Sequence, residues 1–385
     1  MLFSTIGFIL FLLTLFYVLA VLWMFIGLFR IPKGKNSSQP GVSVVVAARN
    51  ESENIDLLLT ALTAQTYPAD KYEIILVDDE STDDTAERVR QYQNSHRNIR
   101  LLQTQNRAQV VSPKKAALHL GITHARGEII LLTDADCVPP PKWIAGMVRY
   151  FEPDVGMVIG FSPYELPDLR KIRHRLFALD SLALAAVAAG TCGWGRPATC
   201  SGRNLAYRKK VFQQVDGFSR IRQFVSGDDD LFLHLVATET DWKIHYAYEP
   251  ALVVPTKILA SLAHFFHQRI RHASKGFHYG WKETSILAGL YLYNVLLFIT
   301  VPLALLYPIT FWLPLAAYAA KSAIELFFLY TFAARMHRRH FLRVFPLAAV
   351  LHIPYVVIFG ALGQVLTFNW KDTQYSKKEK KSIAE

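Results

Sequence analysis

The hydrophobic pattern divides the chain into an apolar N-terminal run, a mixed middle region and an apolar C-terminal region. No charged residue occurs between residues 6 and 28, and a run of that length can span the hydrocarbon core of a bilayer. A cleaved signal peptide is the alternative, but the run is too long for its apolar segment and no basic residues precede it. We therefore predict a transmembrane helix over residues 1–29 and a polar linker over residues 30–40. The linker begins with cationic residues, which favour the cytoplasmic side for the region that follows: Arg30, Lys33 and Lys35.

In the middle region, short apolar runs alternate with polar turns and amphipathic segments. The apolar runs are predicted strands at residues 42–46, 73–77, 100–102 and 128–132, and the amphipathic segments are predicted helices at residues 55–64, 83–92 and 112–125. The strands are continuously apolar instead of alternating, which is typical of parallel strands buried on both faces. The fold class indicated is α/β, with a mostly parallel, Rossmann-like sheet flanked by transmembrane helices.

The chain becomes apolar again over residues 284–370. Three segments there are long enough to cross a membrane, at residues 286–306, 309–336 and 341–368. The second contains Lys321 and Glu325, which lie one helical turn apart and are expected to form an ion pair. Residues 371–385 form a basic tail. Three full spans would place this tail outside, whereas its charge favours the inside, so a re-entrant last segment is the alternative.

Two further segments combine cationic and apolar residues. Residues 257–283 are rich in aromatic and basic side chains, and they predict an amphipathic helix at the membrane surface. Four histidines occur there, at positions 264, 267, 272 and 278, but no carboxylate or cysteine lies among them, so no metal site is predicted. Residues 170–189 look similar, with an apolar run that is interrupted by Asp180 and predicted to be too short to span.

Polar residues gather at the carboxyl ends of the predicted strands, where open parallel sheets bind their ligands. They are Arg49, Asn50 and Glu51, then Asp78 and Asp79, and then Asp134 and Asp136. The last two stand one residue apart directly after an apolar strand. Carboxylate oxygens are hard ligands that hold Mg²⁺ or Mn²⁺ and leave coordination positions for phosphate oxygens. The pattern therefore predicts a site for a metal and a diphosphate.

Composition excludes several other classes of protein. The net charge of +11 is concentrated beside apolar segments, which fits anionic headgroups or a diphosphate substrate better than nucleic acid. Three cysteines without a Cys-x-x-Cys pair indicate neither a disulfide framework nor a zinc site. The turn after the first strand lacks the Gly-x-Gly-x-x-Gly pattern of NAD and FAD enzymes, and no Walker loop is present. The remaining possibility is a nucleotide that the protein binds through carboxylates and a metal ion.

A third group of acidic residues precedes an apolar helix, at Asp228, Asp229 and Asp230. Like charges this close raise one another's pKa, which suits a general base that works near neutral pH. The alternative is that these residues simply favour the positive end of a helix dipole. Residue type alone leaves both interpretations open.

With these motifs in this order, the chain resembles the membrane-bound, inverting family 2 glycosyltransferases with the GT-A fold, which include cellulose, chitin and hyaluronan synthases and ceramide glucosyltransferase. The resemblance covers residues 41 to 275 and the flanking membrane segments. It implies a cytoplasmic GT-A domain over residues 41–256 of a multi-pass protein of the cell (inner) membrane. It also implies a nucleotide-sugar donor, a Mg²⁺ or Mn²⁺ cofactor, a lipid or glycan acceptor and no nucleic-acid partner.

The same resemblance suggests roles for individual residues. Asp136 would be the direct metal ligand, with Asp134 beside it, and Asp228 would be the catalytic base, or Asp229 if the motif is shifted by one residue. Gln268-x-x-Arg271-His272 is similar to the family's Gln-x-x-Arg-Trp motif with His in place of Trp, and would contact the diphosphate and the acceptor. The residues expected to contact the donor are Arg49, Glu51, Asp79, Lys114, Asp134, Gly202 and Asn204.

Three questions stay open at this point. The acceptor is either a growing polysaccharide or a single lipid, and the few C-terminal segments favour a lipid or a short product. A non-catalytic membrane scaffold with a nucleotide-sugar-binding domain is the alternative from another class of protein. A nucleotidyltransferase is less favoured, because it would normally have a glycine-rich first turn.

Overall fold

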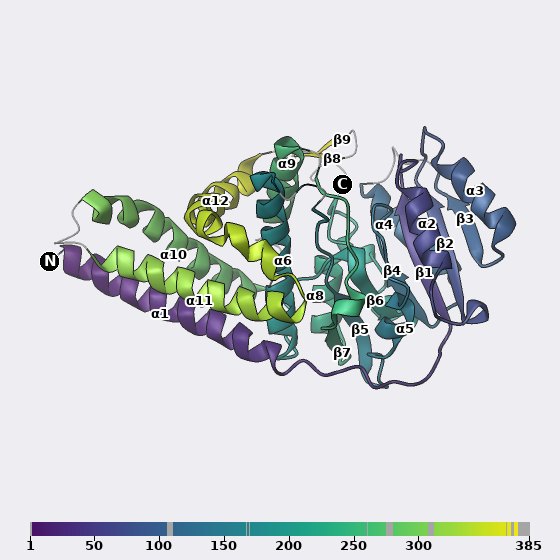
Figure 1. Ribbon diagram of the computed structural model, residues 1–385, viewed down its shortest axis with the longest axis horizontal. Coiled ribbons are helices and arrows are strands. Elements are labelled where there is room, and N and C mark those ends of the chain that lie inside the picture. The colour runs from purple at the N-terminus through teal and green to yellow at the C-terminus, as the bar shows by residue number, and fades with distance from the viewer. Residues whose placement is uncertain are drawn as a thin grey trace.

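The computed structural model describes residues 2–105, 111–166, 168, 170–259, 261–274, 280–306, 312–366, 368–370 and 373–375. Most of the predicted basic tail and His278 lie outside the described residues. The described chain forms a mixed sheet with helices on its faces, joined to a group of long apolar helices (Figure 1).

The sheet has seven strands in the order β3-β2-β1-β4-β6-β5-β7. The strands are β1 (Val42–Ala48), β2 (Tyr72–Asp78), β3 (Ile99–Gln103), β4 (Ile129–Leu132), β5 (Val155–Gly160), β6 (Leu205–Arg208) and β7 (Lys243–Ala247). Only β6 runs antiparallel to its neighbours, β4 and β5. The predicted α/β class and the first four strands are confirmed, and the sequence pattern missed the last three. A short hairpin of β8 (Phe368–Trp370) and β9 (Thr373–Tyr375) lies apart from this sheet.

Short helices connect and cover the strands. They are α2 (Ile55–Thr63), α3 (Thr85–Ser95), α4 (Pro113–His124), α5 (Trp143–Val148), α7 (Lys209–Gln214) and α8 (Asp230–Glu239), with 3-10 turns η1 (Ala69–Lys71), η3 (Gly202–Asn204), η4 (Ser219–Ile221), η5 (Pro250–Leu252) and η6 (Arg339–Val344). Helix α3 begins two residues later than predicted. Its start is set by Asp83, whose carboxylate accepts hydrogen bonds from the backbone N–H groups of Ser52 and Thr85 and so holds the preceding turn.

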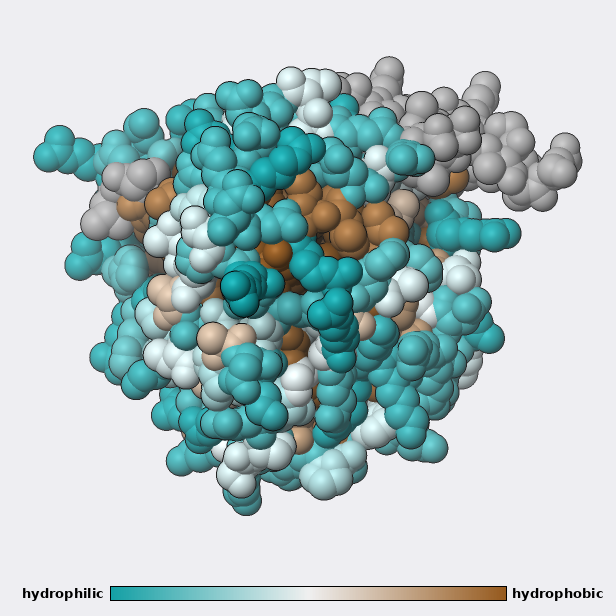
Figure 2. All heavy atoms as spheres, turned by 90° about the vertical axis from the view of Figure 1, so that its right-hand side faces the viewer, coloured by the Kyte–Doolittle hydropathy of each residue, from teal (hydrophilic) through white to brown (hydrophobic). Residues whose placement is uncertain are grey.

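Helices α1 (Leu2–Leu28), α10 (Trp281–Leu306) and α11 (Leu313–Arg335) lie side by side along the long axis of the molecule (Figure 1). Helices α6 (Ile172–Cys192), α9 (Leu262–Ala273) and α12 (Phe345–Val365) lie between them and the sheet. The opposite end of the molecule presents a mostly hydrophilic face, with some hydrophobic residues visible in a recess (Figure 2). The apolar helices therefore occupy one end and the polar surface the other.

Five helices in the described part of the chain are long and apolar enough to cross a membrane: Thr5–Leu28, Ile172–Cys192, Trp281–Leu306, Leu313–Arg335 and Arg339–Val365. The prediction that the segment near Asp180 is too short was wrong, because α6 continues to Cys192. Asp180 does not break it, since the carboxylate pairs with Arg269 at 2.5 Å. Helix α6 also differs from the other four: 61% of its apolar window is buried within the protein, against 28% or less for each of them.

The expected pair of Lys321 and Glu325 is confirmed, with 2.7 Å between Nζ and Oε1. Two other helices contribute to it. The Tyr17 hydroxyl of α1 donates to Glu325, and His352 Nδ1 of α12 lies 2.9 Å from Lys321 Nζ. A buried ammonium is tolerated when a carboxylate compensates its charge, and this group joins α1, α11 and α12.

Helix α12 starts near α6 and ends beside α9. It follows η6, which packs on α6, and near its end the Gln364 amide donates to the carbonyl of Ala273 in α9 at 2.9 Å. Figure 1 shows that α12 does not extend along the full length of α10 and α11. Arg339–Val365 is nevertheless long and apolar enough to span a membrane, so the choice between a full span and a re-entrant segment stays open.

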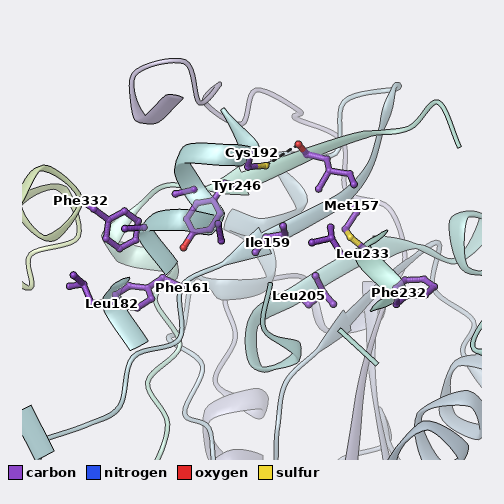
Figure 3. Close-up of a cluster of buried hydrophobic side chains, with 14 of the residues drawn as sticks. Met157, Ile159, Phe161, Leu182, Cys192, Leu205, Phe232, Leu233, Tyr246 and Phe332 are labelled. Atoms are coloured by element: carbon purple, nitrogen blue, oxygen red, sulfur yellow. Dashed lines mark hydrogen bonds between the residues drawn. The ribbon is translucent and has the colours of Figure 1, made fainter. Parts of the chain in front are cut away.

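An apolar cluster joins the sheet to the long helices (Figure 3). Phe332 of α11 contacts the ring of Phe161 edge-on, with centroids 5.5 Å apart, and lies within 6.3 Å of Tyr246 of β7. Leu182 of α6 belongs to the same cluster. Burial of these large side chains fixes α6 and α11 against the edge of the sheet that carries β5 and β7.

Candidate active site

A cavity of about 340 Å³ lies at the carboxyl ends of β1, β2 and β4 and is closed on the far side by α6 and α9. Twelve of the predicted site residues line this cavity. The predicted residues that line the cavity are Arg49, Glu51, Asp79, Lys114, Asp134, Asp136, Gly202, Asp228, Asp229, Gln268, Arg271 and His272. Residues from seven separate segments of the sequence therefore share one cavity.

Lys114 connects two of the acidic motifs. Its ammonium lies 2.9 Å from Asp134 Oδ1 and 3.1 Å from Asp228 Oδ2. Burial alone would lower the pKa of Lys114, but the charges of Asp134 and Asp228 outweigh it and raise this pKa. Lys114 is therefore a permanent cation, and it holds Asp134, which follows β4, close to Asp228, which precedes α8.

Asp136 lines the cavity together with Asp134. Burial, followed by the charge of Asp134, raises the pKa of Asp136. A buried pair of carboxylates is an unfavourable arrangement without a compensating cation. The described residues contain no group of three or more His, Cys, Asp or Glu side chains that could enclose a metal. Asp134 and Asp136 thus fit a Mg²⁺ or Mn²⁺ ion that takes its remaining oxygens from a diphosphate or water.

The three consecutive aspartates before α8 have different surroundings. The Asp229 carboxylate accepts from the backbone N–H of Asp230 at 2.8 Å and from that of Gly202 at 3.2 Å. It therefore caps α8 and anchors η3. Asp228 instead pairs with Lys114. Gly227 before it adopts a φ of +100°, which an L-residue rarely adopts. Of the two, Asp229 holds backbone N–H groups of α8 and η3, whereas Asp228 faces Lys114 in the cavity.

Arg49, Asp79 and Glu51 line the cavity where β1 and β2 end. Arg49 donates to the backbone carbonyls of Asp79 and Glu80 at 2.8 and 2.7 Å. The Asp79 carboxylate accepts from the Thr104 hydroxyl at 3.0 Å. Arg49 thereby fixes the turn after β2, which sets the direction in which Asp79 points.

Asn204 does not reach the cavity. Its side chain is fully buried, its amide donates to the carbonyls of Phe161 and Leu252 at 2.9 Å each, and its oxygen accepts from Trp143 Nε1 at 2.9 Å. Both the amide nitrogen and the oxygen of Asn204 therefore form hydrogen bonds within the protein. The sequence implied a donor contact for Asn204, whereas the structure places it behind the cavity wall.

Arg203, between Gly202 and Asn204, lines the cavity and was not among the predicted site residues. Its guanidinium lies 5.0 Å from the ring centre of Tyr164. Burial would lower the pKa of Arg203, but the neighbouring Tyr164, Cys137 and Asp136 raise it. Arg203 could be noticed in the sequence as a cation between two predicted donor-binding residues. The neighbouring sequence alone does not show that its side chain lies near Asp136.

Helix α9 brings Gln268, Arg271 and His272 to the cavity. The Tyr164 hydroxyl donates to Gln268 Oε1 at 3.2 Å. Between these residues, Arg269 is buried and pairs with Asp180 of α6. The predicted surface helix is thus confirmed as a helix, and it is held in place by a buried ion pair.

Comparison with known proteins agrees with this geometry. Residues 43–216 match the family model of glycosyl transferase family 2. The chain carries a family 2 glycosyltransferase domain. AglE, a glycosyltransferase of Haloferax volcanii, is 38% identical over 220 residues, which are 55% of this chain and 66% of AglE. The poly-beta-1,6-N-acetyl-D-glucosamine synthase of Staphylococcus epidermidis is 25% identical over 255 residues, or 63% of this chain and 56% of that enzyme.

The chain therefore spans about half to two thirds of the length of these curated relatives. Among solved structures, the mannosyltransferase PcManGT from Pyrobaculum calidifontis, in complex with GDP-Man and Mn²⁺, is similar in fold, with a TM-score of 0.57 and 21% identity. The similarity covers 92% of this chain and 99% of that one. The fold is accordingly of the GT-A type, and the resemblance to family 2 glycosyltransferases is confirmed.

Proposed function

We propose that this protein is a membrane-bound, inverting glycosyltransferase that moves a sugar from a nucleotide-diphosphate donor, most simply a UDP-sugar, to a lipid or glycan acceptor at the cytoplasmic face. The observation that carries the proposal is the bridge of Lys114 between Asp134 and Asp228. A site that only binds a nucleotide sugar has no use for a carboxylate at Asp228. A transferase needs one carboxylate near the diphosphate and another near the acceptor.

The proposed reaction is a direct displacement at the anomeric carbon. The acceptor oxygen forms a bond to that carbon as the bond to the diphosphate breaks, and the nucleoside diphosphate leaves with the electron pair. Asp228 takes the proton of the acceptor hydroxyl, a role typically worth about 10²–10⁴ in rate. Attack from the side opposite the leaving group inverts the anomeric configuration.

The charge on the leaving diphosphate requires cations. Arg203, Arg271 and Lys114 line the cavity, and guanidinium groups can hold phosphate oxygens through paired hydrogen bonds. Asp134 and Asp136 would hold Mg²⁺ or Mn²⁺, which supplies Lewis-acid stabilisation of the same oxygens when bound. The complex of PcManGT with GDP-Man and Mn²⁺ supports a divalent metal in this fold.

The test compares the full-length protein with Asp228→Asn and Asp136→Asn. Both variants should lose transfer by at least about 10²-fold, because one removes the base and the other a metal ligand. Asp136→Asn should also weaken metal-dependent binding of the nucleoside diphosphate, whereas Asp228→Asn should retain it. Asp70→Asn, an exposed carboxylate in η1, is the matched control. Transfer at the wild-type rate by Asp228→Asn would refute the assignment of the base.

A further inference from the structure

The cavity has a second wall that the donor chemistry above does not use. It is formed by the end of β5, by β7 and by one face of α6, and its residues are Ile159, Phe161, Ser162, Ser181, Leu184, Ala185, Ala188 and Tyr246. None of the cavity-lining residues from these three elements is charged. The charged lining residues come instead from the ends of β1, β2 and β4, from α4, from η3, from the start of α8 and the residues before it, from the segment after η5 and from α9. The cavity therefore has one charged side and one neutral, largely apolar side.

Helix α6 presents its residues to this wall at helical spacing. Ser181, Leu184, Ala185 and Ala188 follow the i, i+3, i+4, i+7 pattern of one helix face. The Ser181 hydroxyl donates to the carbonyl of Ser162 at 3.2 Å, which fixes α6 against the end of β5. Because the side chains of Ser181, Ala185 and Ala188 are short, room remains for the cavity between α6 and the sheet.

Leu184 shows where this wall ends. It lines the cavity and yet is 42% exposed, so the apolar side of the cavity reaches the outer surface at α6. Helix α6 is itself apolar enough to meet a membrane and packs against α1 and α11. An apolar molecule in the membrane could therefore approach the cavity beside Leu184.

Two buried hydroxyl groups on this wall have no hydrogen-bond partner among the described residues: Tyr246 Oη and Ser162 Oγ. Tyr246 is 1% exposed and Ser162 is 4% exposed. Tyr246 pairs in register with Ile159 of the neighbouring strand, and Figure 3 shows the two beside Phe161. Buried polar groups are almost always hydrogen-bonded, so these hydroxyls indicate a ligand that offers neutral donors or acceptors.

We propose that this wall is the acceptor subsite and that the acceptor is a neutral lipid with a hydroxyl headgroup. Its hydroxyl groups would bond to Tyr246 and Ser162, and its hydrocarbon chains would leave the cavity past Leu184 into the membrane. This inference rests on the proposed function, since Asp228 would accept the proton of the lipid hydroxyl as the anomeric carbon is transferred to its oxygen. A phosphate headgroup is not favoured, because none of the cavity-lining residues from β5, α6 and β7 is charged.

The first experiment compares acceptors for the full-length protein in vesicles, with the donor that supports nucleotide release. The acceptors are diacylglycerol, ceramide, a polyprenyl phosphate and a soluble oligosaccharide. A glycosylated diacylglycerol or ceramide in the mass spectrum, with no comparable product from the other two, is the expected result. A product made chiefly on polyprenyl phosphate or on the oligosaccharide would overturn the inference and leave the proposed transferase intact.

The second experiment tests the wall itself. Leu184→Arg places a charge at the opening and should raise KM for the lipid at least about tenfold, or 1.4 kcal/mol. Ile172→Arg is the control, because Ile172 is 55% exposed on the same helix and does not line the cavity. Thermal-shift binding of the nucleoside diphosphate checks that each variant is folded. An equal change of the lipid KM in both variants would refute the subsite.

Discussion

At the scale of single residues, neighbours in one motif have separate tasks. Gly202 donates its N–H to Asp229 and lines the cavity, Arg203 faces the acidic pair, and Asn204 points into the protein. Gly202, Arg203 and Asn204 form the 3-10 turn η3, in which successive side chains leave in different directions. The sequence identified the segment correctly, but it could not assign Asn204, because its three partners are distant in sequence.

The position of Asn204 leads to a prediction about stability. Asn204→Ala should lower the free energy of unfolding by about 1–3 kcal/mol for each polar group left buried without a partner, with Trp143 Nε1 among them. Thermal unfolding measures the loss, and KM for the donor should stay close to the wild-type value in the folded fraction. A large rise of the donor KM at unchanged thermal stability would instead support direct contact with the donor.

At the scale of elements, β1, β2 and β3 are joined by side chains as well as by their backbone. Glu73 of β2 accepts from the Ser43 hydroxyl of β1 at 2.7 Å and pairs with Arg100 of β3 at 3.2 Å. Burial would raise the pKa of Glu73, but the hydrogen bonds from Ser43, from the backbone of Arg126 and from Arg100 together lower it.

The lowered pKa gives a pH dependence with a defined sign. A carboxylate with a lower pKa in the folded state stabilises the protein above its unfolded pKa of about 4.3, and this contribution is lost as the pH falls through the folded pKa. Glu73→Gln should therefore lower the melting temperature at pH 7, and the difference from the wild type should shrink below about pH 4. A difference that is independent of pH would show that the charge of Glu73 is not involved.

The buried pair of Asp180 and Arg269 is the link between α6 and α9. Removing one partner of a buried pair typically costs about 3–5 kcal/mol, because the other charge is left uncompensated. Arg269→Met should destabilise the protein and displace Gln268 and Arg271, which lowers transfer. The double variant with Asp180→Leu should regain much of the stability, and a double-mutant cycle by thermal unfolding measures this coupling. Additive losses would show that the pair does not act as a unit.

At the scale of the whole molecule, the sequence predicted the elements and motifs that are determined by a local pattern of residues. The continuous apolar strands β1, β2 and β4 and the carboxylates that follow them are local features, and they were found. Strand β6 was missed because its sequence, Leu-Ala-Tyr-Arg, is not a continuous apolar run like that of β4, and its antiparallel pairing with β4 is a tertiary property. The neutral wall of the cavity was missed for the same reason, since it is assembled from β5, α6 and β7.

The apolar helices lie at one end of the molecule, so the two sides of the cavity have different surroundings. The charged side of the cavity lies at the strand ends, and the neutral side lies at α6, next to the long helices. A water-soluble donor and an acceptor from the membrane would therefore reach the same cavity from different sides. The central claim is that a nucleotide-sugar donor is cleaved there with the help of a divalent metal.

Nucleotide release by the full-length protein in detergent tests this claim most directly. The assay covers a panel of UDP- and GDP-sugars with Mn²⁺ or Mg²⁺, each repeated with a chelator. We predict release from one donor that is lost with the chelator and in Asp136→Asn. Release that persists undiminished with the chelator, or that Asp136→Asn supports at the wild-type rate, would contradict the account.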